Sequence, residues 1–124
     1  MLGYLHDIGN CVNRTDHAHS GAIIAYNILK DMGMPVDERT EIMMAIGNHD
    51  ENTGTAVSDI SAALILADKS DVHRDRVTNT NLSTFDIHDR VNYAVTDAKL
   101  KIDKETRKII LNLKIDTKLC PVVD

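Results

Sequence analysis

The sequence predicts an all-α protein, a helical bundle with a β-hairpin appended at its C-terminal end. Two observations lead to this prediction. Apolar residues recur at helical spacing through most of the first 98 residues, whereas residues 99–103 and 109–116 alternate apolar and polar side chains on either side of a turn-like segment. At 124 residues the chain is long enough for one hydrophobic core. We therefore expect residues 1–98 to form a helical domain and residues 99–124 a hairpin extension of the same compact unit.

The first helices are predicted from their stop and start signals. Leu2–Ile8 has the pattern of the last turns of a helix, with Gly9 as its natural end. Asp16 then predicts the N-cap of a helix over His17–Met32, which carries an apolar stripe at i, i+3 and i+4 and stops before Gly33. His17 lies on the apolar side of this helix.

Three further helices follow. Asp37 predicts the cap of a helix whose buried face continues to His49 and Asp50. Ser58 predicts the cap of the next helix, in which residues 60–67 are apolar almost all round, so we expect this helix to be the most buried element. Residues 86–97 predict a last helix before the hairpin.

Composition limits the classes of function. The net charge of −5 argues against nucleic acid or an anionic membrane as the main partner. The longest apolar run, Ala62–Ala67, is far too short to span a membrane, and no secretory leader is recognisable, so we expect a cytoplasmic protein. Cys11 and Cys120 have no CxxC spacing and are interpreted as reduced structural thiols.

Five residues whose side chains can bind a metal ion are predicted to lie at helix ends or on the apolar faces of helices. They are His6, Asp7, His17, His49 and Asp68. A carboxylate near a core is costly unless a cation offsets it, and nitrogen and oxygen ligands of this kind suit Fe, Mn, Ni, Zn or Mg. We therefore predict a site for one or two divalent metal ions. Each residue alone also has a simpler interpretation, such as helix capping, a hydrogen-bonded core histidine or a salt bridge.

Taken in order, these residues resemble the HD superfamily of metal-dependent phosphohydrolases. The resemblance covers roughly residues 2–76 and lies in four stretches: Leu5–Gly9, His17 with Gly21 and Ala22, Ile46–His49, and Ala67–Lys69. It implies the all-helical fold of an HD domain. The family's first metal-binding histidine lies on a helix upstream of the His-Asp pair, and we expect that helix to lie outside this chain.

The resemblance also assigns roles. It implies that His6, Asp7 and Asp68 hold the first metal, and that His17 and His49 bind a second ion or contact phosphate. As catalytic residues it favours Asp68, which would orient the attacking water, together with His17 and His49.

The sequence indicates the substrate-binding residues less strongly than the metal ligands. Lys69, Arg74 and Arg76 are candidates for binding the phosphate group, although the charged segment they belong to is also typical of a solvated, self-paired helix face. Asp50 follows His49 where cyclic-dinucleotide phosphodiesterases commonly carry a second histidine, which weakens that assignment.

Two functions stay open at this point. The first is a metal-dependent phosphohydrolase, a phosphomonoesterase or phosphodiesterase, that hydrolyses a nucleotide or another small phosphate ester through a metal-activated water. The second is a non-catalytic regulatory or nucleotide-binding domain with an incomplete metal site. In both cases the partner is a small molecule, and association into a homo-oligomer is left open.

Overall fold

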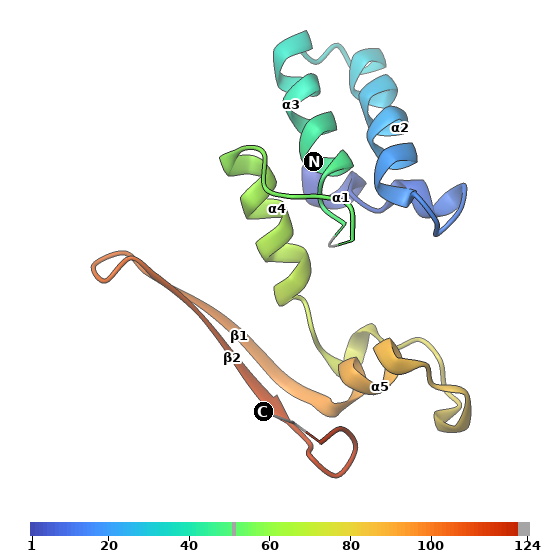
Figure 1. Ribbon diagram of the computed structural model, residues 1–124, viewed down its shortest axis with the longest axis vertical. Coiled ribbons are helices and arrows are strands. Elements are labelled where there is room, and N and C mark those ends of the chain that lie inside the picture. The colour runs from blue at the N-terminus through green and yellow to red at the C-terminus, as the bar shows by residue number, and fades with distance from the viewer. Residues whose placement is uncertain (51, 122–124) are drawn as a thin grey trace. The chain divides into compact units, whose positions relative to one another are not determined.

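The computed structural model describes residues 1–50 and 52–121, and the contacts within the chain divide it into two units, Met1–Asp68 and Lys69–Asp124 (Figure 1). We call them the first and the second unit and describe each by itself. Among the described residues, none of the helices combines the length and the apolar composition that crossing a membrane requires. The predicted domain ranges, 1–98 and 99–124, stay a prediction, because contact density alone does not define a part that folds independently.

The first unit is helical. Its elements are α1 (Leu2–Leu5), the 3₁₀-helix η1 (Ile8–Cys11), α2 (His17–Asp31), α3 (Val36–Gly47) and α4 (Asp59–Ser70), whose last two residues extend into the second unit. Helix α2 packs along α3 and against η1, as Figure 1 shows for the two helices. The core is built from small and branched apolar side chains: Leu5, Ala22, Ala25, Leu29, Ala45, Ile46 and Leu64. Small residues meet at the α2–α3 contact, where a Cβ on Gly47 would lie 3.5 Å from the Cβ of Ala22.

Two of the predicted helix boundaries are wrong, and a third is right although its expected capping bond is absent. The helix expected over Leu2–Ile8 is two short pieces, α1 and η1, separated by a turn. Asp16 is the N-cap residue of α2, which begins at His17 as predicted. However, Asp16 adopts a left-handed conformation with φ of 56° and makes no side-chain capping bond, and its carboxylate lies 3.7 Å from His19 Nδ1. Asp37 lies inside the first turn of α3, whose N-cap is Pro35. A capping residue type permits a cap, but the direction in which the chain enters the helix decides whether its side chain reaches the free N–H groups.

Helix α4 confirms one prediction and contradicts another. Ser58 Oγ accepts a hydrogen bond from the Ser61 backbone N–H at 3.1 Å, as its capping role requires. The expectation that α4 is the most buried element is wrong, because only Ser61 and Leu64 are buried, whereas Ile60 and Leu66 are 38% and 37% exposed. The most buried helix is α2, which is covered by neighbours on more than one side.

The second unit combines one α-helix with a hairpin. Its elements are η2 (Arg74–Arg76), η3 (Leu82–Thr84), α5 (Ile87–Ala94), β1 (Val95–Asp103) and β2 (Lys108–Ile115). The Asp86 side chain caps α5 by accepting a bond from the Asp89 N–H at 2.7 Å. Helix α5 then passes directly into β1 and also packs against η2.

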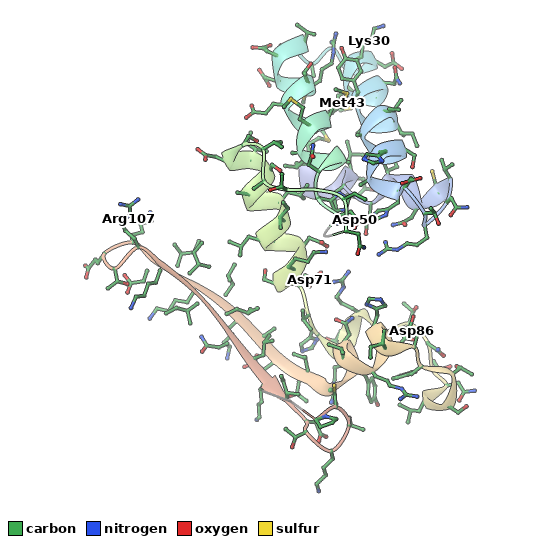
Figure 2. All side chains as sticks on the ribbon, in the orientation of Figure 1. Lys30, Met43, Asp50, Asp71, Asp86 and Arg107 are labelled. Atoms are coloured by element: carbon green, nitrogen blue, oxygen red, sulfur yellow. The ribbon has the colours of Figure 1, made fainter. Side chains whose placement is uncertain are left out.

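The two strands pair antiparallel with a register that segregates their side chains. Leu100 lies opposite Leu111 and Ile102 opposite Ile109, so apolar residues share one face of the ribbon. The tip is closed by a turn in which Arg107 has a left-handed φ of 53° (Figure 2). The predicted hairpin is therefore confirmed, although β1 begins earlier than expected.

The predicted fold class is wrong. The chain is not all-α, because two strands of nine and eight residues form a regular antiparallel sheet. The physical reason is the alternation of apolar and polar residues in most of β1 and β2, which gives an apolar face only when the backbone is extended. The coarser expectation of a helical bundle followed by a C-terminal hairpin agrees with the structure.

Candidate metal centre

Four segments of the first unit contribute ligand-type side chains to one place. His6 and Asp7 occupy the turn between α1 and η1, and His17 is the first residue of α2. His49 follows α3, two residues beyond its last helical residue, and Asp68 lies near the end of α4. All five are positioned at or just outside helix ends, so their side chains are fixed by the backbone of short, well-packed elements.

A close backbone contact holds the His6–Asp7 turn in place. Gly9, which was predicted to end a helix, instead packs against the start of α2. A Cβ on Gly9 would lie 2.6 Å from the Gly21 backbone nitrogen and closer still to the carbonyl oxygen of His17. Only a residue without a side chain fits there. The contact therefore fixes the turn that carries His6 and Asp7 against the helix that carries His17.

The three histidines of this site are oriented in the same way. In each, ring nitrogen Nδ1 lies within hydrogen-bond distance of the carbonyl oxygen three residues earlier. The pairs are His6 with Gly3 at 2.7 Å, His17 with Arg14 at 3.1 Å and His49 with Ile46 at 2.6 Å. Because a carbonyl can only accept, each Nδ1 is assigned the proton and each neutral ring keeps a lone pair on Nε2. This arrangement is typical of histidines that bind a metal through Nε2.

These Nε2 atoms face carboxylate oxygens at uniform distances. Nε2 of His17 lies 3.4 Å, and Nε2 of His49 3.6 Å, from Oδ1 of Asp7. Nε2 of His6 lies 3.6 Å from Oδ2 of Asp7 and 3.4 Å from Oδ1 of Asp68. A charge-assisted hydrogen bond would be shorter, about 2.7–2.9 Å. Two ligands of one ion with bonds of about 2.1 Å lie about 3.0–3.4 Å apart in octahedral or tetrahedral geometry. The observed distances are near these values, so the residues fit a shared cation.

One ligand group is particularly compact. One ligand atom each from His6, Asp7 and His49 lies within 4.8 Å of the other two. The side chains of His17 and His49 are only 5% and 3% exposed, whereas that of Asp7 is 43% exposed. The rings of His6 and His17 each meet the His49 ring edge to face, at 5.2 and 5.1 Å between centroids. The group thus has a rigid imidazole wall and an open side at Asp7 through which a small molecule could reach it.

Asp50 is a neighbour of this group to which the sequence analysis assigned no role. It lies in the loop after α3 (Figure 2), and its Oδ2 is 3.6 Å from Nδ1 of His17. The backbone N–H of Asn52, followed by the Asn52 side chain and the nearby rings of His17 and His49, holds the pKa of Asp50 below its ordinary value, against the opposing effect of burial. Asp50 is thus an ionised carboxylate beside His17. The signal available in the sequence was its position after His49, at the end of the predicted buried face.

The structure brings together all five predicted metal residues. The predicted phosphate-binding residues, Lys69, Arg74 and Arg76, belong to the second unit. The Arg74 guanidinium donates to the carbonyl oxygen of Tyr93 at 3.1 Å, and Arg76 pairs with Asp71. The Arg76–Asp71 pair agrees with the simpler interpretation of this segment as self-paired, whereas Arg74 binds the backbone of α5. The substrate role of these three residues stays a prediction.

The comparisons with known proteins identify no relative. Neither protein-family models, nor curated proteins, nor solved structures match the chain. The case for a function therefore depends on the geometry of the first unit.

Proposed function

We propose that the protein is a metal-dependent phosphohydrolase that acts on a nucleotide or another small phosphate ester. The observation that supports this proposal most strongly is the convergence of three Nε2 lone pairs and two carboxylates at separations of 3.4–3.6 Å. The resemblance of the same residues, in the same order, to the ligands of HD phosphohydrolases supports the choice of reaction. This resemblance is limited to the residues of the site and does not extend to the predicted fold class.

The residues divide into ligands for one or two ions. His6, Asp7, His49 and Asp68 would hold the first, and His17 with the Oδ1 atom of Asp7 would contribute to a second. A divalent cation held by these residues would supply a Lewis acid for activating water and for offsetting the charge of the phosphoryl oxygens. Asp68, whose side chain is 17% exposed, is the carboxylate that would orient the attacking water and receive its proton.

The substrate's phosphate needs a cation from the protein, and the first unit offers few. Its sequence contains three Lys or Arg residues, Arg14, Lys30 and Arg39. Lys30 lies at the far end of α2 from His17, and Arg39 is held by a backbone carbonyl and a tyrosine ring. The Arg14 carbonyl oxygen lies at the His17 ring, and within the described part of the chain the Arg14 guanidinium donates to Asn10 Oδ1 alone, at 3.3 Å. We therefore add Arg14 to the candidate phosphate-binding residues.

The test is metal analysis of the purified full chain, followed by a panel of nucleotides and phosphomonoesters with added Mn²⁺ or Fe²⁺. We expect bound metal and hydrolysis of at least one substrate. Asp68→Ala should reduce turnover by about a hundredfold or more while the far-ultraviolet circular dichroism stays unchanged. Asp59→Ala, an exposed acidic position in the first turn of the same helix, is the matched control and should keep full activity.

The two candidate functions give different results in this experiment. Full activity of Asp68→Ala would refute the assigned role of Asp68. Stoichiometric metal without turnover on any member of the panel would instead support the second candidate, a nucleotide-binding regulatory domain.

A further inference from the structure

The second unit contains a cavity that the proposed hydrolase chemistry does not use. Its volume is about 240 Å³, and its lining comes from η3, α5 and the turn after β2. The lining residues are Leu82, Phe85, Arg90, Tyr93 and Leu119. All of them belong to the second unit, so the cavity is independent of the candidate metal centre.

One wall of the cavity is aromatic and already held in place. Phe85 is buried, and its ring meets the Tyr93 ring edge to face with 5.2 Å between centroids. The Arg74 guanidinium lies 5.1 Å from the Tyr93 ring centroid and also donates to the Tyr93 carbonyl oxygen at 3.1 Å. These contacts fix both rings before any ligand arrives, which reduces the entropy cost of binding.

The rim of the cavity is apolar and open to solvent. Leu82 and Leu119 are 57% and 45% exposed, although both border a cavity with a buried aromatic base. An exposed leucine alone needs no explanation, but two that flank one hollow form an apolar patch of the kind that marks a binding site. An apolar ligand that enters the cavity would cover both.

Arg90 gives the cavity a charge. Among residues 1–50 and 52–121, its side chain makes no hydrogen bond or ion pair, and Asp86, one helical turn earlier, uses its carboxylate to cap α5. Arg74 and Arg76, in contrast, are both engaged. The guanidinium at the rim is therefore available for an oxyanion, and its planar donors suit a carboxylate.

We propose that this cavity binds a small apolar carboxylate, with one aromatic ring or a branched acyl group against Phe85 and Tyr93 and the carboxylate on Arg90. The volume is below the range of about 300–1,000 Å³ that is usual for drug-sized ligands, so the ligand is small. A purely apolar ligand would leave Arg90 unused. A bare phosphate would leave the aromatic wall and the two leucines exposed.

The experiment titrates the full chain with phenylacetate and with its neutral analogue phenylacetamide, and follows leucine methyl groups by NMR. Both probes fill the same volume, so their difference reports the charge contact. We expect phenylacetate to bind saturably and about tenfold or more tightly than the amide, with the largest shifts at Leu82 and Leu119. This comparison needs no variant and is insensitive to folding defects.

Two variants then assign the contact. Arg90→Gln should remove the preference for phenylacetate over phenylacetamide, whereas Arg107→Gln, at the hairpin tip of the same unit, should retain it. No saturable binding of phenylacetate, equal affinity for the two probes, or an unchanged preference in Arg90→Gln would each overturn the proposal. Binding of phosphate or of hydrolase substrates to the first unit does not enter any of these measurements.

Discussion

Gly9→Ala is the most informative single substitution, because it tests how the candidate metal centre is held together. The added methyl group meets backbone on two sides, the Gly21 nitrogen at 2.6 Å and the carbonyl of His17 at a still shorter distance. Neither atom is the end of a flexible side chain, so η1 has to move away from α2. Introducing a methyl group into such a contact costs about 3 kcal/mol, the upper end of the usual range for overpacking. The same displacement separates His6 and Asp7 from His17.

Two assays follow from this reasoning. Thermal unfolding monitored by circular dichroism should show the helical transition lowered by about 10 °C. Isothermal titration with Mn²⁺ at a temperature where the variant is folded should show metal affinity reduced by at least about tenfold, because the ligands lie on both sides of the contact.

A neighbouring glycine provides the matched control. Gly3 lies within α1, and a Cβ there would meet nothing within 4 Å. Gly3→Ala keeps the carbonyl oxygen that accepts from His6, and it should be neutral or slightly stabilising, since alanine is the better helix former. If Gly9→Ala were as stable as Gly3→Ala and bound metal equally well, the backbone contact would not position the site and the reasoning would be refuted.

Further predictions concern the core and the hairpin. Leu29→Ala, at a fully buried position of α2, should destabilise the first unit by about 2–5 kcal/mol in urea unfolding. Ile23→Ala, on the exposed side of the same helix, should change the free energy of unfolding by less than about 0.5 kcal/mol. Equal effects of the two substitutions would contradict the assigned faces. Hydrogen bonds from the side chain and backbone of Thr106, and from the Glu105 backbone, hold the pKa of Asp103 below its ordinary value of 3.8. The stabilisation of the hairpin turn is therefore complete above that value and is lost as the pH falls through the lowered pKa. Asp103→Asn should abolish this acid dependence of the hairpin NMR shifts, and an unchanged dependence would assign it to another group.

The sequence by itself determined the local structure of much of the chain. Helical spacing of apolar residues located α2, α3 and α4, and alternation located the hairpin, because each pattern produces an apolar face in only one backbone geometry. The Ser58 cap followed from residue type and spacing alone. The types of the candidate ligands, His6, Asp7 and His49 among them, could also be predicted, since such side chains near apolar helix ends need partners.

Only the tertiary structure decided how those elements use their surfaces. The run of apolar residues in α4 predicted burial on all sides, but burial depends on which neighbours pack there, and just one side of the helix meets the core. Likewise no local pattern predicted that Gly9 touches α2 or that α5 forms a unit with the hairpin. Helical spacing placed Asp50 on the buried face of its helix but did not predict its contact with His17. Contacts between residues far apart in sequence depend on the packing of whole elements, whereas helix and strand periodicity depends on neighbours within a turn or two of the chain.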